Sequence, residues 1–363
     1  MQSLALAFVG DSLIRHDDFC DYAIRKARSQ LGIPSCVARF SDNDKNLFLS
    51  LEYLVKNSHQ LILLSPKESL PTVMKLIATL HEDTLIWQNE RLIPSKTLHA
   101  EKGSYLLELE GCLINLLEVD ELGELPAILL PPAKEEICLY LMGIDEESAL
   151  LLLSPLAQSH NLSLKALSHA QGFGMLLAKP LKFSDEESFL EGVKALFGEK
   201  ILPASSLASK VVEILSQKKH VVTTAESCTG GDVAQILTQI PGASEVFHGG
   251  VITYDNEIKE RWLEVEREHL DLYGAVSEAV VKDMLKGALR VARAHYSLAI
   301  SGIAGPGGGS DHKPVGTVFI GVRSQEGQEI VERLLFKGDR RYIQRQAALH
   351  GLYLLLRLLL EGE

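Results

Sequence analysis

The sequence predicts a multidomain protein of the α/β class. The chain has 363 residues, enough for two or three domains at roughly 100–200 residues each. Hydrophobic residues make up 46% of it, which provides material for packed cores and argues against a disordered chain. In the first third, buried-strand patterns alternate with helical patterns, an order typical of a parallel sheet covered on both faces.

The first domain is expected to span residues 1–135. An apolar strand pattern covers residues 4–9 and ends at Gly10-Asp11, and a helical pattern follows around 21–30. A second buried strand is expected at 60–64 and a second helix at 72–80. The double proline near 129–132 interrupts this alternation and is a plausible domain boundary.

A smaller α+β unit is expected over residues 136–202. Two helical patterns, at 146–160 and 185–196, flank the strand patterns LSLKAL and GMLLAKPL. Residues 201–206 (ILPASS) have the composition of a linker, and Ser206 is placed to cap a helix that runs to Lys218.

The last domain, residues 203–363, is expected to be α/β. Strand patterns occur at 220–224, 250–254, 298–301, 316–323 and 330–336. An amphipathic helix is expected from its cap at Ser277 to His295, and a final helix from about Asp339 to Leu360.

Charge and composition exclude several classes of function. With 36 basic and 48 acidic residues the formal net charge is −12, which disfavours broad binding to a nucleic-acid backbone but allows a small pocket for one phosphate. The five scattered cysteines form no C-x-x-C pair, so neither a disulfide framework nor a zinc site is indicated. We expect a cytoplasmic protein without a membrane span, because no apolar stretch reaches about 20 residues.

Two clusters of candidate catalytic residues follow strands of the last domain. The first is TAESCTGG at 224–231, where hydroxyls and a thiol precede two glycines whose N–H groups suit an oxyanion or phosphate. The second places Tyr254 and Lys259 five residues apart, and Ser–Lys pairs are an alternative to Ser–His. The alternatives are an ordinary turn and a solvated lysine.

Two further clusters could hold a ligand. The loop SGIAGPGGG at 301–309, followed by Lys313, lets the backbone approach a ligand closely, although it matches neither a Walker loop nor a dinucleotide fingerprint. The segment GDRRY at 338–342 places arginines at the start of the last helix. A flexible surface loop and ordinary helix-start charges are the alternatives.

In this order the motifs ESCTGG, TYDNEIK, YGAVSEAVV, SGIAGPGGGSDHKPVGTV and FKGDRRYIQRQA resemble the C-terminal domain of the CinA (competence/damage-inducible) family. That domain is shared with stand-alone nicotinamide-nucleotide amidases, and the resemblance covers about Lys210 to Leu359. It implies hydrolysis of the carboxamide of nicotinamide mononucleotide to nicotinate mononucleotide and ammonia. The family's nucleophile falls on Ser227, its activating lysine on Lys259 and its accompanying tyrosine on Tyr254.

These roles imply a mechanism without a metal or cofactor. Ser227 would attack the amide carbon, Lys259 would accept its proton, and Tyr254 would orient Lys259 or stack on the pyridinium ring. The oxyanion would be held by N–H groups of Thr229, Gly230 or Gly231. The candidates for the substrate's phosphate and ribose are Gly305, Gly307, Gly308, Lys313 and Arg340. Gln344 departs from the family, which more often has arginine there, and this weakens a phosphate role at that position.

The amino-terminal domain more faintly resembles the family's molybdopterin-binding-like α/β domain, which is associated with a metal-dependent ADP-ribose pyrophosphatase activity. Ser12 stands in place of the family's acidic residue, and the loop at 64–71 lacks the glycines and paired aspartates. We therefore expect an inactive scaffold or dimerisation element, and hence a homo-oligomer. The middle unit resembles a KH-like module, but without a basic G-x-x-G loop it predicts no nucleic-acid partner.

A second interpretation is a binding or regulatory CinA-like protein that holds a nucleotide without turnover. A protein that only binds would have no reason to keep Ser227, Tyr254 and Lys259 together. The complete set therefore favours the amidase, acting on a small pyridine nucleotide.

Overall fold

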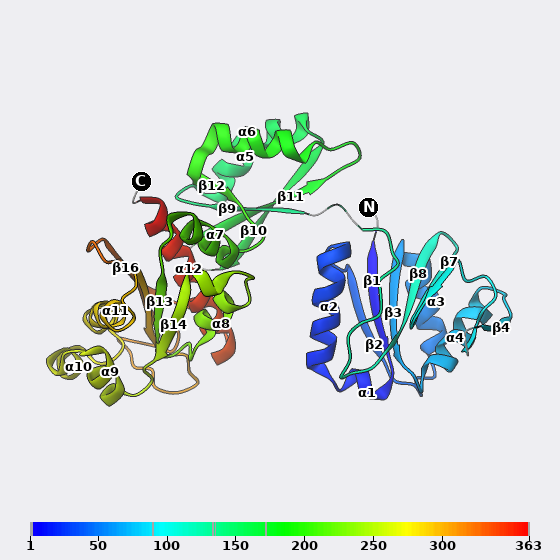
Figure 1. The fold of residues 1–363 in the computed structure, drawn as a ribbon, viewed down its shortest axis with the longest axis horizontal. Helices are drawn as coiled ribbons and strands as arrows, with labels where there is room; N and C mark the ends of the chain where they lie inside the picture. The colour runs from blue at the N-terminus through cyan, green and yellow to red at the C-terminus, as the bar shows by residue number, and fades with distance from the viewer. Residues whose placement is uncertain (1–2, 89–90, 133, 135, 171–172, 362–363) are drawn as a thin grey trace. The chain divides into compact units, whose positions relative to one another are not determined.

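The computed structural model describes residues 3–88, 91–132, 134, 136–170 and 173–361. The chain forms two compact units, Met1–Glu135 and Glu136–Glu363, each drawn in Figure 1. They are called unit 1 and unit 2 below.

Unit 1 is built on a six-stranded sheet in the order β2-β1-β3-β8-β7-β6. Four strands are parallel, and β7 and β6 extend the sheet antiparallel on one side. In chain order the strands are β1 (Leu4–Val9), β2 (Cys36–Phe40), β3 (Gln60–Pro66), β6 (His99–Glu101), β7 (Ser104–Leu109) and β8 (Cys112–Val119), with a separate hairpin of β4 (Leu85–Gln88) and β5 (Arg91–Pro94).

Helices cover both faces of the unit 1 sheet, as the alternating patterns predict. The helix α2 (Asp17–Leu31), preceded by α1 (Asp11–Ile14), packs on the face that carries Leu6 and Phe8. The helices α3 (Leu47–Asn57) and α4 (Leu70–Leu80) pack on the other face, against Ala5 and Ala7. Figure 1 shows α2 and α4 on opposite sides of β1 and β3.

The first part of unit 2 is an antiparallel sheet in the order β10-β11-β9-β12. Its strands are β9 (Ile137–Leu141), β10 (Leu162–Ala170), β11 (Phe173–Pro180) and β12 (Ile201–Pro203), and its helices are α5 (Glu146–Ser159), α6 (Glu186–Phe197) and the 3₁₀ turn η1 (Gly198–Lys200). Residues 201–203, expected to be part of a linker, instead form β12. The composition of this segment is typical of a linker and gives no strand signal. In the structure, Ile201 and Leu202 nevertheless pair with β9 and bury their side chains.

This sheet packs between two layers of helices. The α5 and α6 helices cover one face. The other face contributes Tyr140 and Met175 to the core around α7 (Leu207–Lys218) and α12 (Arg340–Glu361), and the ring of Phe173 stacks on Tyr353 at 4.8 Å. The parts on either side of residue 203 therefore share one hydrophobic core.

The second sheet of unit 2 has the order β14-β13-β15-β16-β17. The first three strands are parallel and the last two antiparallel. Their bounds are β13 (Val222–Glu226), β14 (Phe247–Ile252), β15 (Tyr296–Gly302), β16 (Thr317–Ser324) and β17 (Glu329–Leu335). All five lie within a few residues of the predicted positions.

Helices also cover both faces of this second sheet. One face packs on α11 (Glu278–Ala292), with α9 (Asn256–Leu263) and α10 (Arg267–Tyr273) beyond it, and the other packs on α12, with α7 and α8 (Asp232–Thr238) beside it. A 3₁₀ turn, η2 (Ala243–Glu245), precedes β14. Figure 1 shows α11 and α8 on opposite sides of β13.

The helix α12 is apolar nearly all round because it lies between the two sheets of unit 2, where leucines on every side are buried. Among the helices in the described residues, none combines the length and apolar character needed to cross a bilayer.

Candidate functional site

A cavity of about 260 Å³ lies at the carboxyl ends of β13 and β15. This is the edge of a parallel sheet where ligands usually bind. All four sequence clusters reach it: its lining is Ser227, Cys228, Tyr254, Lys259, Ala275, Val276, Ser301, Gly302, Ile303, Ala304, Gly305, Gly307, Gly308 and Arg340. The fold therefore assembles segments that are up to 113 residues apart in the chain, from Ser227 to Arg340.

Ser227 is the first residue after β13 and is 7% exposed. Its N–H donates to the carbonyl of Ile300 in β15 at 3.0 Å, which ties the turn to the neighbouring strand. Gly230 and Gly231 follow with φ of +62° and +102°. Because side chains disfavour this left-handed region, the two glycines allow the chain to reverse into α8.

The glycine turn differs from the predicted oxyanion site because a protein carboxylate already occupies its donors. Glu226 is fully buried, and its carboxylate accepts N–H groups of Gly231 at 3.0 Å, Val233 at 3.1 Å and Ala234 at 2.9 Å. The N–H of Gly230 donates to the carbonyl of Ser227. Neither predicted glycine therefore has a free donor, and neither lines the cavity.

The N–H groups of Cys228 and Thr229 are the other donors of this turn. Within the described part of the chain, neither N–H has an acceptor on another residue. Cys228 lines the cavity, whereas Thr229 does not appear in its lining. Burial raises the pKa of the Cys228 thiol to about 12, so this thiol stays protonated at neutral pH and is a poor nucleophile.

Lys259 is the second reactive group on the cavity wall. It lies on α9 and is only 1% exposed, and its Nζ donates to the backbone carbonyl of Tyr254 at 3.0 Å. Burial lowers the pKa of this amine, with Asp255 opposing the shift. A lowered pKa increases the fraction of neutral amine, the form that can accept a proton.

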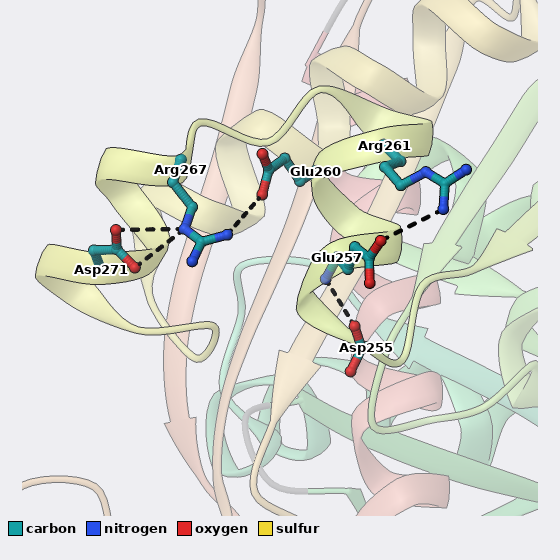
Figure 2. Close-up of polar contacts among 6 residues, drawn as sticks. All are labelled: Asp255, Glu257, Glu260, Arg261, Arg267 and Asp271. Carbon is teal, nitrogen blue, oxygen red and sulfur yellow. Dashed lines mark hydrogen bonds and ion pairs between the residues drawn. The ribbon is translucent and has the colours of Figure 1, made fainter.

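The opposite side of α9 is a charged, exposed surface. Asp255 begins the helix by accepting the N–H of Glu257, and Glu257 pairs with Arg261 (Figure 2). Arg267 at the start of α10 pairs with Glu260 and Asp271. Since the acidic and basic groups lie outside, the helix presents Lys259 to the interior.

Tyr254 and Arg340 form one edge of the cavity. Arg340 donates through Nη2 to the phenol oxygen of Tyr254 at 2.9 Å and through Nη1 to the carbonyl of Gly305 at 2.6 Å. Tyr254 is 62% exposed. It is the backbone carbonyl of Tyr254, and not its phenol, that contacts Lys259.

The glycine loop after β15 forms the adjoining part of the cavity wall, in contact with Arg340 through Gly305. Gly305 has φ +83°, and a Cβ there would lie 2.6 Å from Cγ1 of Val315, so the position requires glycine. Gly307 and Gly308 also line the cavity, as predicted for a ligand loop. The predicted partner Lys313 is not in the lining, because its Nζ donates to the carbonyl of Tyr273 at 2.7 Å.

In the described residues, one group of side chains has the spacing of a metal site: Glu266, His269 and Asp283. None of the three lines the cavity. His269 Nδ1 and Asp283 Oδ2 are already hydrogen-bonded at 2.6 Å. This hydrogen bond raises the pKa of His269, as expected for an ion-paired imidazole.

Sequence reasoning missed two residues that contact the turn around Ser227. The sequence shows Glu226 only as part of the ESCTGG motif, although a carboxylate just before a glycine turn and a helix start is suited to accept N–H groups. Gln344 was considered only for phosphate binding, whereas its Nε2 donates to the carbonyl of Cys228 at 2.6 Å. No local signal identifies the contact between Gln344 and Cys228, because these two residues are far apart in the sequence.

Comparisons with known proteins place this site in a family. The family model described as the CinA C-terminal domain matches residues 204–359. Nicotinamide-nucleotide amidohydrolase PncC of Escherichia coli is 49% identical over 146 residues, which are 40% of this chain and 88% of the relative. A putative competence-damage inducible protein of Caldicellulosiruptor saccharolyticus is 36% identical over 299 residues, 77% of this chain and 70% of that protein.

Among solved structures, the competence/damage inducible protein CihA of Agrobacterium tumefaciens is 38% identical, with 42% of this chain and 93% of that chain covered and a TM-score of 0.41. The family assignment rests on the sequence relatives. The chain belongs to the CinA family.

Proposed function

We propose that this member of the CinA family hydrolyses the carboxamide of nicotinamide mononucleotide, giving nicotinate mononucleotide and ammonia. The observation that carries the proposal is that Ser227 and the buried amine of Lys259 line one cavity. A relative 49% identical over the matching region bears the name nicotinamide-nucleotide amidohydrolase, which supports the choice of substrate.

In the first step the Ser227 hydroxyl attacks the carboxamide carbon. A new C–O bond forms, the carbonyl π electrons move to oxygen, and Lys259 accepts the hydroxyl proton. Burial favours the neutral amine that this step needs. The hydrogen bond from Lys259 to the Tyr254 carbonyl supports this role, because it holds Nζ at the cavity wall.

The oxyanion is stabilised by the N–H groups of Cys228 and Thr229. These two replace Gly230 and Gly231, whose donors bond within the turn. One such donor contributes about 3–4 kcal/mol to transition-state stabilisation.

Collapse of the tetrahedral intermediate breaks the C–N bond. Lys259, now an ammonium, returns its proton to the departing nitrogen, and ammonia leaves behind an acyl ester on Ser227. Water then attacks the ester carbon while Lys259 again accepts a proton. Lys259 returns this proton to Oγ of Ser227 as the ester C–O bond breaks, so nicotinate mononucleotide is released and both residues regain their starting forms.

The substrate's ribose and phosphate are bound by the glycine loop and Arg340. Two guanidinium N–H groups of Arg340 hold Gly305 and Tyr254, and the remaining donors can contact a phosphate oxygen. Gly307 and Gly308 let the backbone approach the ribose. Tyr254 offers an exposed ring on which the pyridinium can stack.

We further propose that unit 1 has no pyrophosphatase activity. At its first strand–helix turn the Gly10 Cα is crowded by Pro66, whose ring would lie 2.7 Å from a Cβ, and Ser12 supplies no carboxylate for a metal. ADP-ribose incubated with the full chain and Mg²⁺ should stay intact. Metal-dependent formation of AMP would contradict this proposal.

The direct test measures ammonia released from nicotinamide mononucleotide by the wild type and by Ser227→Ala. We expect release by the wild type alone. If the wild type released no more ammonia than the variant while still binding the nucleotide, the protein would be a binding or regulatory member of the family.

A further inference from the structure

We propose that Glu226 and Gln344 are positioning residues that hold the turn at 226–231 from two sides and thereby aim its free amides at the reacting carbonyl. The inference rests on the proposed amidase function and deepens it. The reasoning starts from the hydrogen bonds that the turn makes with its own surroundings.

Glu226 fixes the carboxyl-terminal half of the turn. Its buried carboxylate accepts three N–H groups at the start of α8, and it takes the place that an anionic ligand could otherwise occupy. An oxyanion therefore cannot be held by Gly231 or by the start of α8. The available donors of the turn are confined to Cys228 and Thr229.

Gln344 fixes the peptide between those two residues. Its Nε2 donates to the Cys228 carbonyl at 2.6 Å, which directs that carbonyl toward α12. In a trans peptide the N–H lies opposite the carbonyl, so the Thr229 N–H points away from α12. A donor on the carbonyl also polarises the peptide and makes the Thr229 N–H a stronger donor.

The next residue on α12 provides a matched control. Arg345 pairs with Asp232 at 3.1 Å, so it links the same helix to the residue that opens α8. It makes no hydrogen bond to the Cys228–Thr229 peptide in the described chain. Removing it perturbs the packing of α12 on α8 without releasing that peptide.

The experiment compares Gln344→Leu, Gln344→Lys and Arg345→Leu in the full chain, with ammonia release from nicotinamide mononucleotide as the assay. We expect Gln344→Leu to lower kcat about 3- to 10-fold, the effect of one neutral hydrogen bond. Its KM and the pH inflection of the rate should stay unchanged, because Lys259 and the substrate contacts are untouched. Gln344→Lys restores a donor and should recover most of kcat, and Arg345→Leu should stay within twofold of the wild type.

Glu226→Gln tests the other side of the turn. The amide keeps the shape of the side chain but places an NH₂ group against at least one N–H donor, so we expect kcat to fall about 10- to 100-fold, the effect of a hydrogen bond to a charged group. Thermal unfolding of the same sample separates this loss from loss of folding. Should Glu226→Gln not fold, the Gln344 series decides the matter alone.

Amide hydrogen exchange of residues 227–231 gives a measurement that does not require turnover. Exchange should be faster in Gln344→Leu than in Arg345→Leu. The inference is overturned if the wild type is active and Gln344→Leu has the same kcat and the same exchange rates as Arg345→Leu. That result would leave the proposed amidase function standing. An inactive wild type contradicts the proposed function, and the exchange data still decide whether Gln344 holds the turn.

Discussion

In both units helices cover a sheet whose strands are parallel on one side and antiparallel on the other, and in both a glycine follows the carboxyl end of a central parallel strand. After β1 of unit 1, Gly10 has φ +149°, and a Cβ there would lie 2.7 Å from the Pro66 ring. After β13 of unit 2, Ser227 and Cys228 line a cavity of about 260 Å³ that also has the buried Lys259 on its wall, and Gly230 and Gly231 follow at positive φ.

The difference lies in the loops and not in the class of sheet. Unit 2 surrounds its strand ends with a glycine loop and the first turn of α12. In unit 1, Pro66 packs against the corresponding glycine. The proposal that only unit 2 is catalytic rests on this difference, because function depends on the residues at the strand ends and not on the scaffold.

The largest effect is expected from a pair of substitutions, one after β13 of unit 2 and one after β1 of unit 1. Ser227→Ala should lower ammonia release about 10⁴-fold or more, as loss of a covalent nucleophile does. Asp11→Asn, at the equivalent edge of unit 1, should leave the rate unchanged. The assay is ammonia release at saturating substrate, and a loss of activity in Asp11→Asn would contradict the contrast.

The second prediction concerns Lys259, the proposed base in unit 2. The rate should rise with pH through an apparent pKa below the ~10.4 of a free lysine, because burial lowers the pKa of Lys259 and only the neutral amine accepts the proton. Lys259→Met should remove this dependence and lower kcat about 10²-fold or more. A wild-type rate that is flat from neutral to alkaline pH would count against the assignment.

The same pKa shift predicts a change of stability with pH. Between the lowered pKa of folded Lys259 and the higher value of the unfolded chain, the unfolded state binds more protons, so the free energy of unfolding rises with pH. Denaturant titrations across this window should show the rise in the wild type. The rise should be absent from Lys259→Met.

A matched pair of glycine substitutions compares the two strand ends again, and the expected effects are smaller. Gly305→Ala and Gly10→Ala both add a Cβ at positive φ, 2.6 Å from Val315 and 2.7 Å from Pro66 respectively. Each should destabilise its own unit by about 1–3 kcal/mol. Only Gly305→Ala should also raise KM, and equal KM values in the two variants would remove the loop from the substrate site.

The smallest effect is expected from removing unit 1. A chain of residues 136–363 keeps every residue of the cavity and the core shared by α12 and the antiparallel sheet. Its kcat and KM should stay within about twofold of the full chain, because the described residues that line the cavity all belong to unit 2. A larger change would mean that unit 1 regulates the amidase.

Local sequence patterns predicted β1 and β3 of unit 1 and all five strands of the second sheet of unit 2. The cap at Ser206, the glycine turn after β13 and these strands depend on neighbouring residues, which the sequence displays directly. The strand β12 was missed because two apolar residues beside a proline give too short a signal. The helices α9 and α10 were not anticipated because they are only 8 and 7 residues long.

The sequence by itself determined the α/β class and the resemblance to the family, because periodicity and motif order are properties of neighbouring residues. Tertiary structure decided which donors are free. Glu226 accepts the N–H of Gly231, a predicted oxyanion donor. Gln344 donates to the carbonyl of Cys228, 116 residues away in the sequence, and Lys313 donates to the carbonyl of Tyr273. A hydrogen bond depends on distance and direction in space, and the order of residues along the chain does not specify these.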